Sequence, residues 1–216
     1  MEQNLSKKTR TESDLIGSRE VPESALYGVQ TLRGIENFRI SKFHLNEYPL
    51  FIQALAITKM GAAVANRELD LLTEEQTNAI LKACKEILEG KHHEQFPVDM
   101  IQGGAGTTTN MNANEVIANR ALELLGHQRG EYQYCSPNDH VNRSQSTNDA
   151  YPTAIHIGLY YTHLKLVKHF VELIESFRKK GKEFAHVIKM GRTQLEDAVP
   201  MTLGQEFDCL LYTSDA

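Results

Sequence analysis

Residues 151–189 read YPTAIHIGLYYTHLKLVKHFVELIESFRKKGKEFAHVIK and carry the longest regular pattern in the chain. Bulky side chains and one glycine recur there at alternating spacings of three and four, at Phe170, Leu173, Phe177, Gly181, Phe184 and Ile188. This heptad-like stripe predicts one long helix, which would reach roughly 57 Å at 1.5 Å per residue. A helix of that length needs other helices around it, so the stretch indicates a long helix bundle.

Helical patterns also dominate the sequence before this stretch. Pro49 stands where a buried helix over about 49–70 could begin. Thr73-Glu-Glu-Gln76 is a capping-box pattern that opens a second helix, which Gly90 ends. A third helix is predicted from about Asn110 to Leu125, because Gly126 follows it.

Alternation of the kind that marks strands is scarce, and only Glu131–Tyr134 reads as a short extended piece. The predicted fold class is therefore all-α. Residues 1–140 are predicted to form an N-terminal helical domain, and residues 141–216 to begin a central bundle. The first twenty residues are polar, and 1–15 are expected to be a flexible arm.

Composition excludes several classes of protein. The net charge is −5 and no basic stripe is present, which argues against nucleic-acid binding. No apolar run is long enough to span a bilayer, because Gln53 and Lys59 interrupt the longest one. Three widely spaced cysteines without a Cys/His cluster predict reduced thiols in a cytoplasmic protein and no metal site.

Three loop-like segments are rich in hydroxyl and amide side chains, at 102–110, 136–149 and 191–206. The first places glycines before a helix start, which suits an anion, although a plain glycine-rich turn with a threonine cap fits equally well. The second could simply cap the long helix through Asn148 or Asp149, and in the third Pro200 and Thr202 could start another helix. Together the segments offer many neutral donors and few cations, a set that can hold a small dicarboxylate.

These segments resemble a known family. The motifs are REVPESALYGVQTLRGIENF (19–38), GGAGTTTNMNANEV (103–116), GEYQYCSPNDHVNRSQSTNDAYPT (130–153) and KMGRTQLEDAVPMTLGQEF (189–207). In this order they closely resemble the fumarase/aspartase superfamily, whose fold has an N-terminal helical domain followed by a central bundle of long helices. Thr193-Gln194 stands where fumarases usually carry Thr-His, and this departure points to the aspartate ammonia-lyase (aspartase) branch.

The resemblance implies a carbon–nitrogen lyase that reversibly converts L-aspartate to fumarate and ammonia. The implied reaction is an anti elimination through an enolate-like dianion, whose extra charge lies on the β-carboxylate. By the same resemblance, Thr107, Ser146 and Thr147 would hold that carboxylate and its developing charge. Fumarase, or another dicarboxylate lyase of the superfamily, remains the alternative, and a non-catalytic protein such as a recruited lens crystallin is a third possibility.

The resemblance also gives roles to Asn148, which would touch the amino group, to Thr193, which would hold the α-carboxylate, and to Gln194, which would line the site. No histidine is assigned to catalysis. Metal ligands are not expected, and no cofactor is implied apart from a possible activation by Mg²⁺. The family forms homotetramers in which three subunits build each active site.

A secondary carboxylate site known in fumarases matches Ser136, Asn138 and Asp139, although Ser136 replaces a histidine there. The family's catalytic base is a serine in a mobile loop far downstream, and nothing after residue 207 resembles it. We therefore predict that the sequence is a fragment without a catalytic residue of its own, inactive alone. The helix stripe is expected to leave an exposed apolar face that promotes association.

Overall fold

The structure is a computed structural model that describes residues 8–214, with side chains described from 8 to 211. Its contacts divide the chain into two units, residues 1–160 and 161–216. Helices make up most of both units and each sheet has two strands, which confirms the all-α class. The boundary that the sequence suggests near residue 140 stays a prediction.

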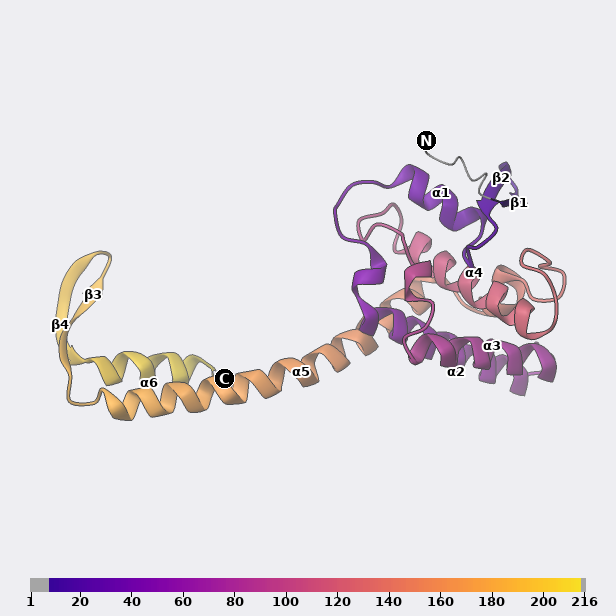
Figure 1. The fold of residues 1–216 in the computed structure, drawn as a ribbon. Helices are drawn as coiled ribbons and strands as arrows, with labels where there is room; N and C mark the ends of the chain where they lie inside the picture. Colours follow the sequence, from indigo (N-terminus) through magenta and orange to yellow (C-terminus); the bar gives the residue numbers. More distant parts are fainter. Residues whose placement is uncertain (1–7, 215–216) are drawn as a thin grey trace, which may run out of the picture. The chain divides into compact units, whose positions relative to one another are not determined.

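Three helices that lie side by side form the core of the first unit (Figure 1). They are α2 (Pro49–Glu68), α3 (Glu74–Leu88) and α4 (Thr107–Leu124). All three predicted helices are confirmed, although α4 begins three residues before Asn110. Their buried aliphatic side chains include Ile52, Leu55, Ile80, Ile87, Ile117 and Leu122.

The capping box before α3 is also confirmed. The backbone N–H of Gln76 donates to Thr73 Oγ1 at 3.2 Å, and the N–H of Thr73 donates to Gln76 Oε1 at 3.2 Å. Two of the helix's otherwise unpaired groups are thereby satisfied by local sequence alone.

Shorter elements connect these helices. They are α1 (Val29–Asn37), the 3₁₀ turns η1 (Leu45–Glu47) and η2 (His93–Gln95), and the π-helical turn η3 (Pro137–Val141). The extended piece expected at Glu131–Tyr134 is wrong, because these residues form turns. The N–H of Tyr134 donates to the carbonyl of Glu131 at 3.1 Å, and the Glu131 carboxylate accepts from the N–H of Gln128 at 2.7 Å, so local bonds curl the chain.

The flexible arm expected over residues 1–15 is wrong for residues 9–14, which form a strand. β1 (Thr9–Asp14) pairs antiparallel with β2 (Gly17–Pro22) in a hairpin. Arg10 anchors it, because its guanidinium donates to the carbonyls of Pro22, Ala25 and Tyr27 at 2.8–3.1 Å. Residues 1–7, the rest of the expected arm, lie outside the described residues.

The second unit contains the end of the long helix α5 (Thr147–Glu183), the strands β3 (Ile188–Thr193) and β4 (Glu196–Thr202), and α6 (Leu203–Ser214). Figure 1 shows α6 folded back along the end of α5. The Phe207 ring lies 5.8 Å from the rings of Phe177 and Phe184, so residues of the predicted stripe do pack on a helix.

The long-helix prediction is confirmed from 151 to 183 and wrong for 184–189. Ile188 pairs with Thr202 in the hairpin instead of continuing the stripe. The reason is that the residues after the helix pair with the returning chain: the N–H groups of Leu203 and Gly204 donate to the carbonyls of Val187 and Phe184. Pro200 lies within β4, whereas Thr202 does cap α6, since its Oγ1 accepts from the Gln205 N–H.

The exposed apolar face expected for the stripe is confirmed only in part: Phe177 and Phe184 pack against Phe207, whereas several large apolar side chains nearer the middle of α5 are exposed in this single chain. They include Leu164, Leu166, Val167, Phe170, Val171 and Leu173. None of the helices that the structure describes is both long and apolar enough to cross a membrane.

An ion pair between α3 and α4 gives a testable pH dependence. Arg120 donates to the two carboxylate oxygens of Glu86 at 2.6 and 2.8 Å, and these bonds lower the pKa of Glu86 to about 2. Because the folded pKa lies below the ordinary value of 4.5, this stabilisation is present above pH 4.5 and is lost as the pH falls toward 2.

In urea titrations, the free energy of unfolding should therefore fall by about 2 kcal/mol more across this pH window in the unsubstituted chain than in Glu86→Gln. The variant removes the titrating group and leaves the bond from Arg120 to Glu123 possible. Equal slopes in the two proteins would contradict the assignment.

Candidate functional site

A cluster of buried polar side chains lies where α2, α4 and the segment before α5 meet. Lys59 of α2 is fully buried, and its Nζ donates to Asn110 Oδ1 at 2.7 Å, Asn142 Oδ1 at 2.9 Å and Gln145 Oε1 at 2.9 Å. Burial lowers the pKa of Lys59 to about 7, while Cys84 and Asp149 oppose this shift. All three acceptors are neutral amides, so the cluster is held by hydrogen bonds around one cation.

The glycine-rich segment 102–106 leads directly into α4. Gly104 and Gly106 have left-handed backbones (φ 71° and 84°), and Gly106 is the residue before the helix. The Gln102 side chain fixes this turn, since it accepts from the N–H of Thr109 and donates to Thr109 Oγ1, both at 2.8 Å. Thr107 is thereby placed at the first position of α4, exposed, at the positive end of the helix dipole.

The segment before α5 is a compact turn. Asn142 Nδ2 donates to the carbonyl of Gln145 at 3.0 Å, which closes it. Ser146 then caps α5: its Oγ accepts from the Asn148 N–H at 3.1 Å, and its own N–H lies 3.3 Å from both oxygens of Asp149. The expected cap at Asn148 or Asp149 is therefore wrong by position, because the Ser146 hydroxyl takes that role.

The starts of α4 and α5 lie together. Asn110 Nδ2, one turn into α4, donates to Thr147 Oγ1 at 3.2 Å. A Cβ atom on Gly106 would overlap the ring of Tyr151, which is one turn into α5. The structure thus brings Thr107, Ser146, Thr147 and Asn148 to two adjacent helix N-termini, where backbone N–H groups and dipoles favour an anion.

Thr193 and Gln194 belong to the second unit. Thr193 ends β3, and Gln194 with Leu195 forms the hairpin turn in left-handed conformations (φ 47° and 69°). Both predicted residues are exposed. Their place beside Thr107 and Thr147 in one site stays a prediction.

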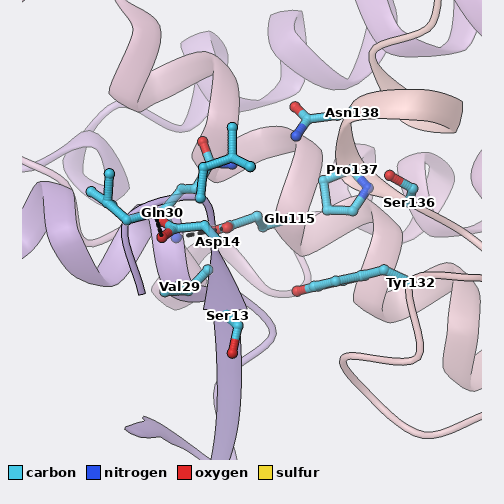
Figure 2. A pocket seen from close by; sticks show the side chains of 11 residues that line it. Ser13, Asp14, Val29, Gln30, Glu115, Tyr132, Ser136, Pro137 and Asn138 are labelled. Atoms are coloured by element: carbon cyan, nitrogen blue, oxygen red, sulfur yellow. Dashed lines mark hydrogen bonds between the residues drawn. The ribbon is translucent and has the colours of Figure 1, made fainter. Parts of the chain in front are cut away.

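The residues of the expected secondary carboxylate site lie at η3. The Ser136 hydroxyl accepts from the N–H of Asp139 at 3.1 Å, so it caps this turn. Ser136 and Asn138 also line a pocket of about 540 Å³, whose opposite side includes Gln30 and Asp14 (Figure 2).

The charges of that pocket come from two carboxylates, and no lysine or arginine among residues 8–214 lines it. Asp14 is neutralised by two bonds from Arg33 at 2.8 and 2.9 Å, and Glu115 accepts from backbone N–H groups. A carboxylate ligand would meet only neutral donors here, and its binding stays a prediction. Within residues 8–214, no group of three His, Cys, Asp or Glu side chains is placed to hold a metal ion.

The sequence patterns did not identify Lys59 or Asn110 as parts of the site. One signal was present: Lys59 interrupts a mostly apolar run within a helix that is buried on several sides. A lysine is almost never fully buried unless it is paired, so such a position indicates a dedicated set of acceptors.

Comparisons with known proteins agree with the motifs. The model of the Lyase family matches residues 17–214. An aspartate ammonia-lyase of Pseudomonas canavaninivorans is 61% identical over 198 residues, which are 92% of this chain and 42% of that protein. The chain therefore spans less than half the length of this relative.

Two solved structures share the fold. The fumarate lyase:delta crystallin of Brucella melitensis bound to cobalt has a TM-score of 0.89 at 53% identity, covering 96% of this chain and 45% of that one. A class II fumarase of Schistosoma mansoni has a TM-score of 0.83 at 37% identity, and the match covers 96% of this chain and 44% of the fumarase. Because the family model matches nearly the whole chain and these folds agree, the chain belongs to the Lyase family, the fumarase/aspartase superfamily.

Proposed function

We propose that this chain forms part of an aspartate ammonia-lyase, which eliminates ammonia from L-aspartate to give fumarate. One observation carries the proposal: Thr107, Ser146, Thr147 and Asn148 gather at two adjacent helix N-termini. The 61% identity to an aspartate ammonia-lyase, against 37% to a fumarase, favours this reaction over hydration of fumarate.

The chemistry fits these residues. A base removes the proton from the carbon beside the β-carboxylate, and the electron pair first enters that carboxylate to give a dianion. The pair then forms the carbon–carbon double bond while the carbon–nitrogen bond breaks and ammonia leaves. Hydroxyl donors at Thr107, Ser146 and Thr147 would stabilise the dianion, since fixed donors are most effective where charge develops.

The remaining contacts belong to the same proposal. Asn148 would bind the amino group, Thr193 the α-carboxylate, and Gln194 would line the site. The base would come from residues that the relatives have beyond the part matched by this chain, and Mg²⁺ would act as an activator. The exposed apolar side chains of α5 support a homotetramer in which other copies cover them.

The test uses a chimera of residues 1–207 followed by the remaining part of the Pseudomonas canavaninivorans protein. Fumarate formation is followed by its ultraviolet absorbance, with aspartate and with malate as substrates. We expect activity with aspartate, a loss of about 1,000-fold or more in kcat/KM in Thr107→Ala,Thr147→Ala, and no activity in the 216-residue chain alone.

The matched control is Thr9→Ala,Thr11→Ala, which removes two hydroxyls from the exposed hairpin and should change kcat/KM by less than twofold, about the scatter of such assays. Fumarate formed from malate but not from aspartate would replace the proposal by a fumarase. Full activity of the Thr107→Ala,Thr147→Ala chimera would contradict the proposed substrate site. Fumarate formation by the 216-residue chain would contradict a catalytic base that lies outside this chain.

A further inference from the structure

Lys59 stands out among the buried groups because the proposed reaction does not use it. Its Nζ has three partners, Asn110, Asn142 and Gln145, at 2.7–2.9 Å. An ammonium group has three N–H donors, so the three amide oxygens match it completely. Taking an ammonium group out of water is costly, and the three acceptors offset that cost only because they are already placed around it.

The cation determines how the Asn110 amide is turned. With Oδ1 facing Lys59, the amide nitrogen faces the other way and donates to Thr147 Oγ1 at 3.2 Å and to Asn142 Oδ1 at 3.1 Å. The reversed amide would set its N–H donors against the ammonium donors, and such a contact is repulsive. The protonated form of Lys59 therefore selects one orientation of the Asn110 amide.

That orientation determines what the Thr147 hydroxyl can do. A threonine hydroxyl has one proton to donate and two lone pairs that accept. Because Thr147 Oγ1 already accepts from Asn110, its proton does not point at Asn110 and stays available for another acceptor. A carboxylate, which only accepts, is the kind of partner that such a hydroxyl binds.

We propose that Lys59 is a positioning residue which, through Asn110, keeps the Thr147 hydroxyl proton directed to a ligand carboxylate. This inference rests on the proposed function, because it assumes that Thr147 meets a carboxylate. Lys59 itself lies beneath the site and is not a catalytic residue.

The sharpest variant is Asn110→Asp, which keeps a partner for Lys59 but reverses the bond to Thr147. A carboxylate at 110 can only accept, so the Thr147 hydroxyl would turn its proton inward. In the chimera described above, kcat/KM should fall about 100-fold in Asn110→Asp and by a similar factor in Thr147→Val. The thermal midpoint of Asn110→Asp should stay near that of the parent.

Gln145→Glu is the matched control, because it also sets one carboxylate against Lys59, at a side chain whose amide nitrogen donates to the carbonyls of Val141 and Arg143 instead of to Thr147. It should lower kcat/KM by less than about tenfold. The decisive protein is Asn110→Asp,Thr147→Val: once the hydroxyl is gone its direction no longer matters, so its kcat/KM should equal that of Thr147→Val.

Losses that simply multiply in this double variant would overturn the inference, since Asn110 would then act by charge or packing. An unaffected Thr147→Val or an inactive parent chimera would instead count against the proposed function. In either case, the 216-residue chain supplies a second measurement by nitrogen NMR of its lysine side chains. The Lys59 ammonium protons should exchange with water more slowly than those of exposed Lys82, and Asn110→Asp should shift the Lys59 resonance; equal exchange rates would overturn the positioning role.

Discussion

Glu115→Gln is expected to lower the free energy of unfolding by about 3 kcal/mol, because one carboxylate caps a helix from inside the core. Glu115 of α4 is buried, and its oxygens accept from the N–H groups of Gly28, Gln30 and Thr31 at 2.9–3.0 Å. These three groups belong to the start of α1, where backbone N–H groups have no partner within the helix. Burial raises the pKa of Glu115 although the backbone donors oppose it.

A glutamine at 115 keeps the size and the burial but has only one acceptor oxygen. Its NH₂ group would face an N–H of α1, which leaves buried donors unpaired at about 1–3 kcal/mol each. Urea unfolding followed by circular dichroism measures the loss. Glu68→Gln, an exposed change at the end of α2, is the control and should shift stability by less than about 0.5 kcal/mol. Equal midpoints for the two variants would show that the carboxylate does not hold α1.

This helix cap shows why the sequence predicted some elements and missed others. Thr73 and Gln76 of the capping box are three positions apart, so the sequence alone predicts their contact. The carboxylate of Glu115 reaches α1 across more than 80 positions, and no local pattern indicates that contact.

The two hairpins were missed for the same physical reason. β1 is anchored by Arg10, whose acceptors are backbone carbonyls at Pro22, Ala25 and Tyr27. Every residue has a backbone carbonyl, so the sequence does not show which carbonyls accept a hydrogen bond. In β3 the apolar side chains of Ile188 and Met190 are exposed whereas Lys189 is only partly exposed, so the polarity of the side chains does not indicate which face of the strand is covered.

Some residues of the candidate site could likewise be predicted from the sequence, and others could not. Thr107, Ser146 and Thr147 could be proposed because their motifs resemble a family, and the structure places them at adjacent helix starts. Lys59 could not, because its three acceptors lie 51, 83 and 86 positions away. Burial of a charge is a property of the packed fold, whereas periodicity reports only which face of a helix is apolar.

Gly106→Ala is expected to lower the free energy of unfolding by about 3 kcal/mol, of which the left-handed backbone explains about 1 kcal/mol. Gly106 and Gly126 flank α4 and share the same backbone angle, φ 84°. A Cβ atom on Gly126 would meet nothing within 4 Å, whereas one on Gly106 would overlap the Tyr151 ring. Gly126→Ala is therefore a matched control that costs only the backbone strain.

The difference between the two variants, about 2 kcal/mol, measures how tightly the start of α4 is pressed against α5. A double-mutant cycle assigns that difference to one contact: in a Tyr151→Ala background, Gly106→Ala should cost no more than Gly126→Ala does. An undiminished cost in that background would place the strain elsewhere in the loop. The expected result would mean that the starts of α4 and α5, which carry Thr107 and Thr147, can pack this closely only with a glycine at position 106.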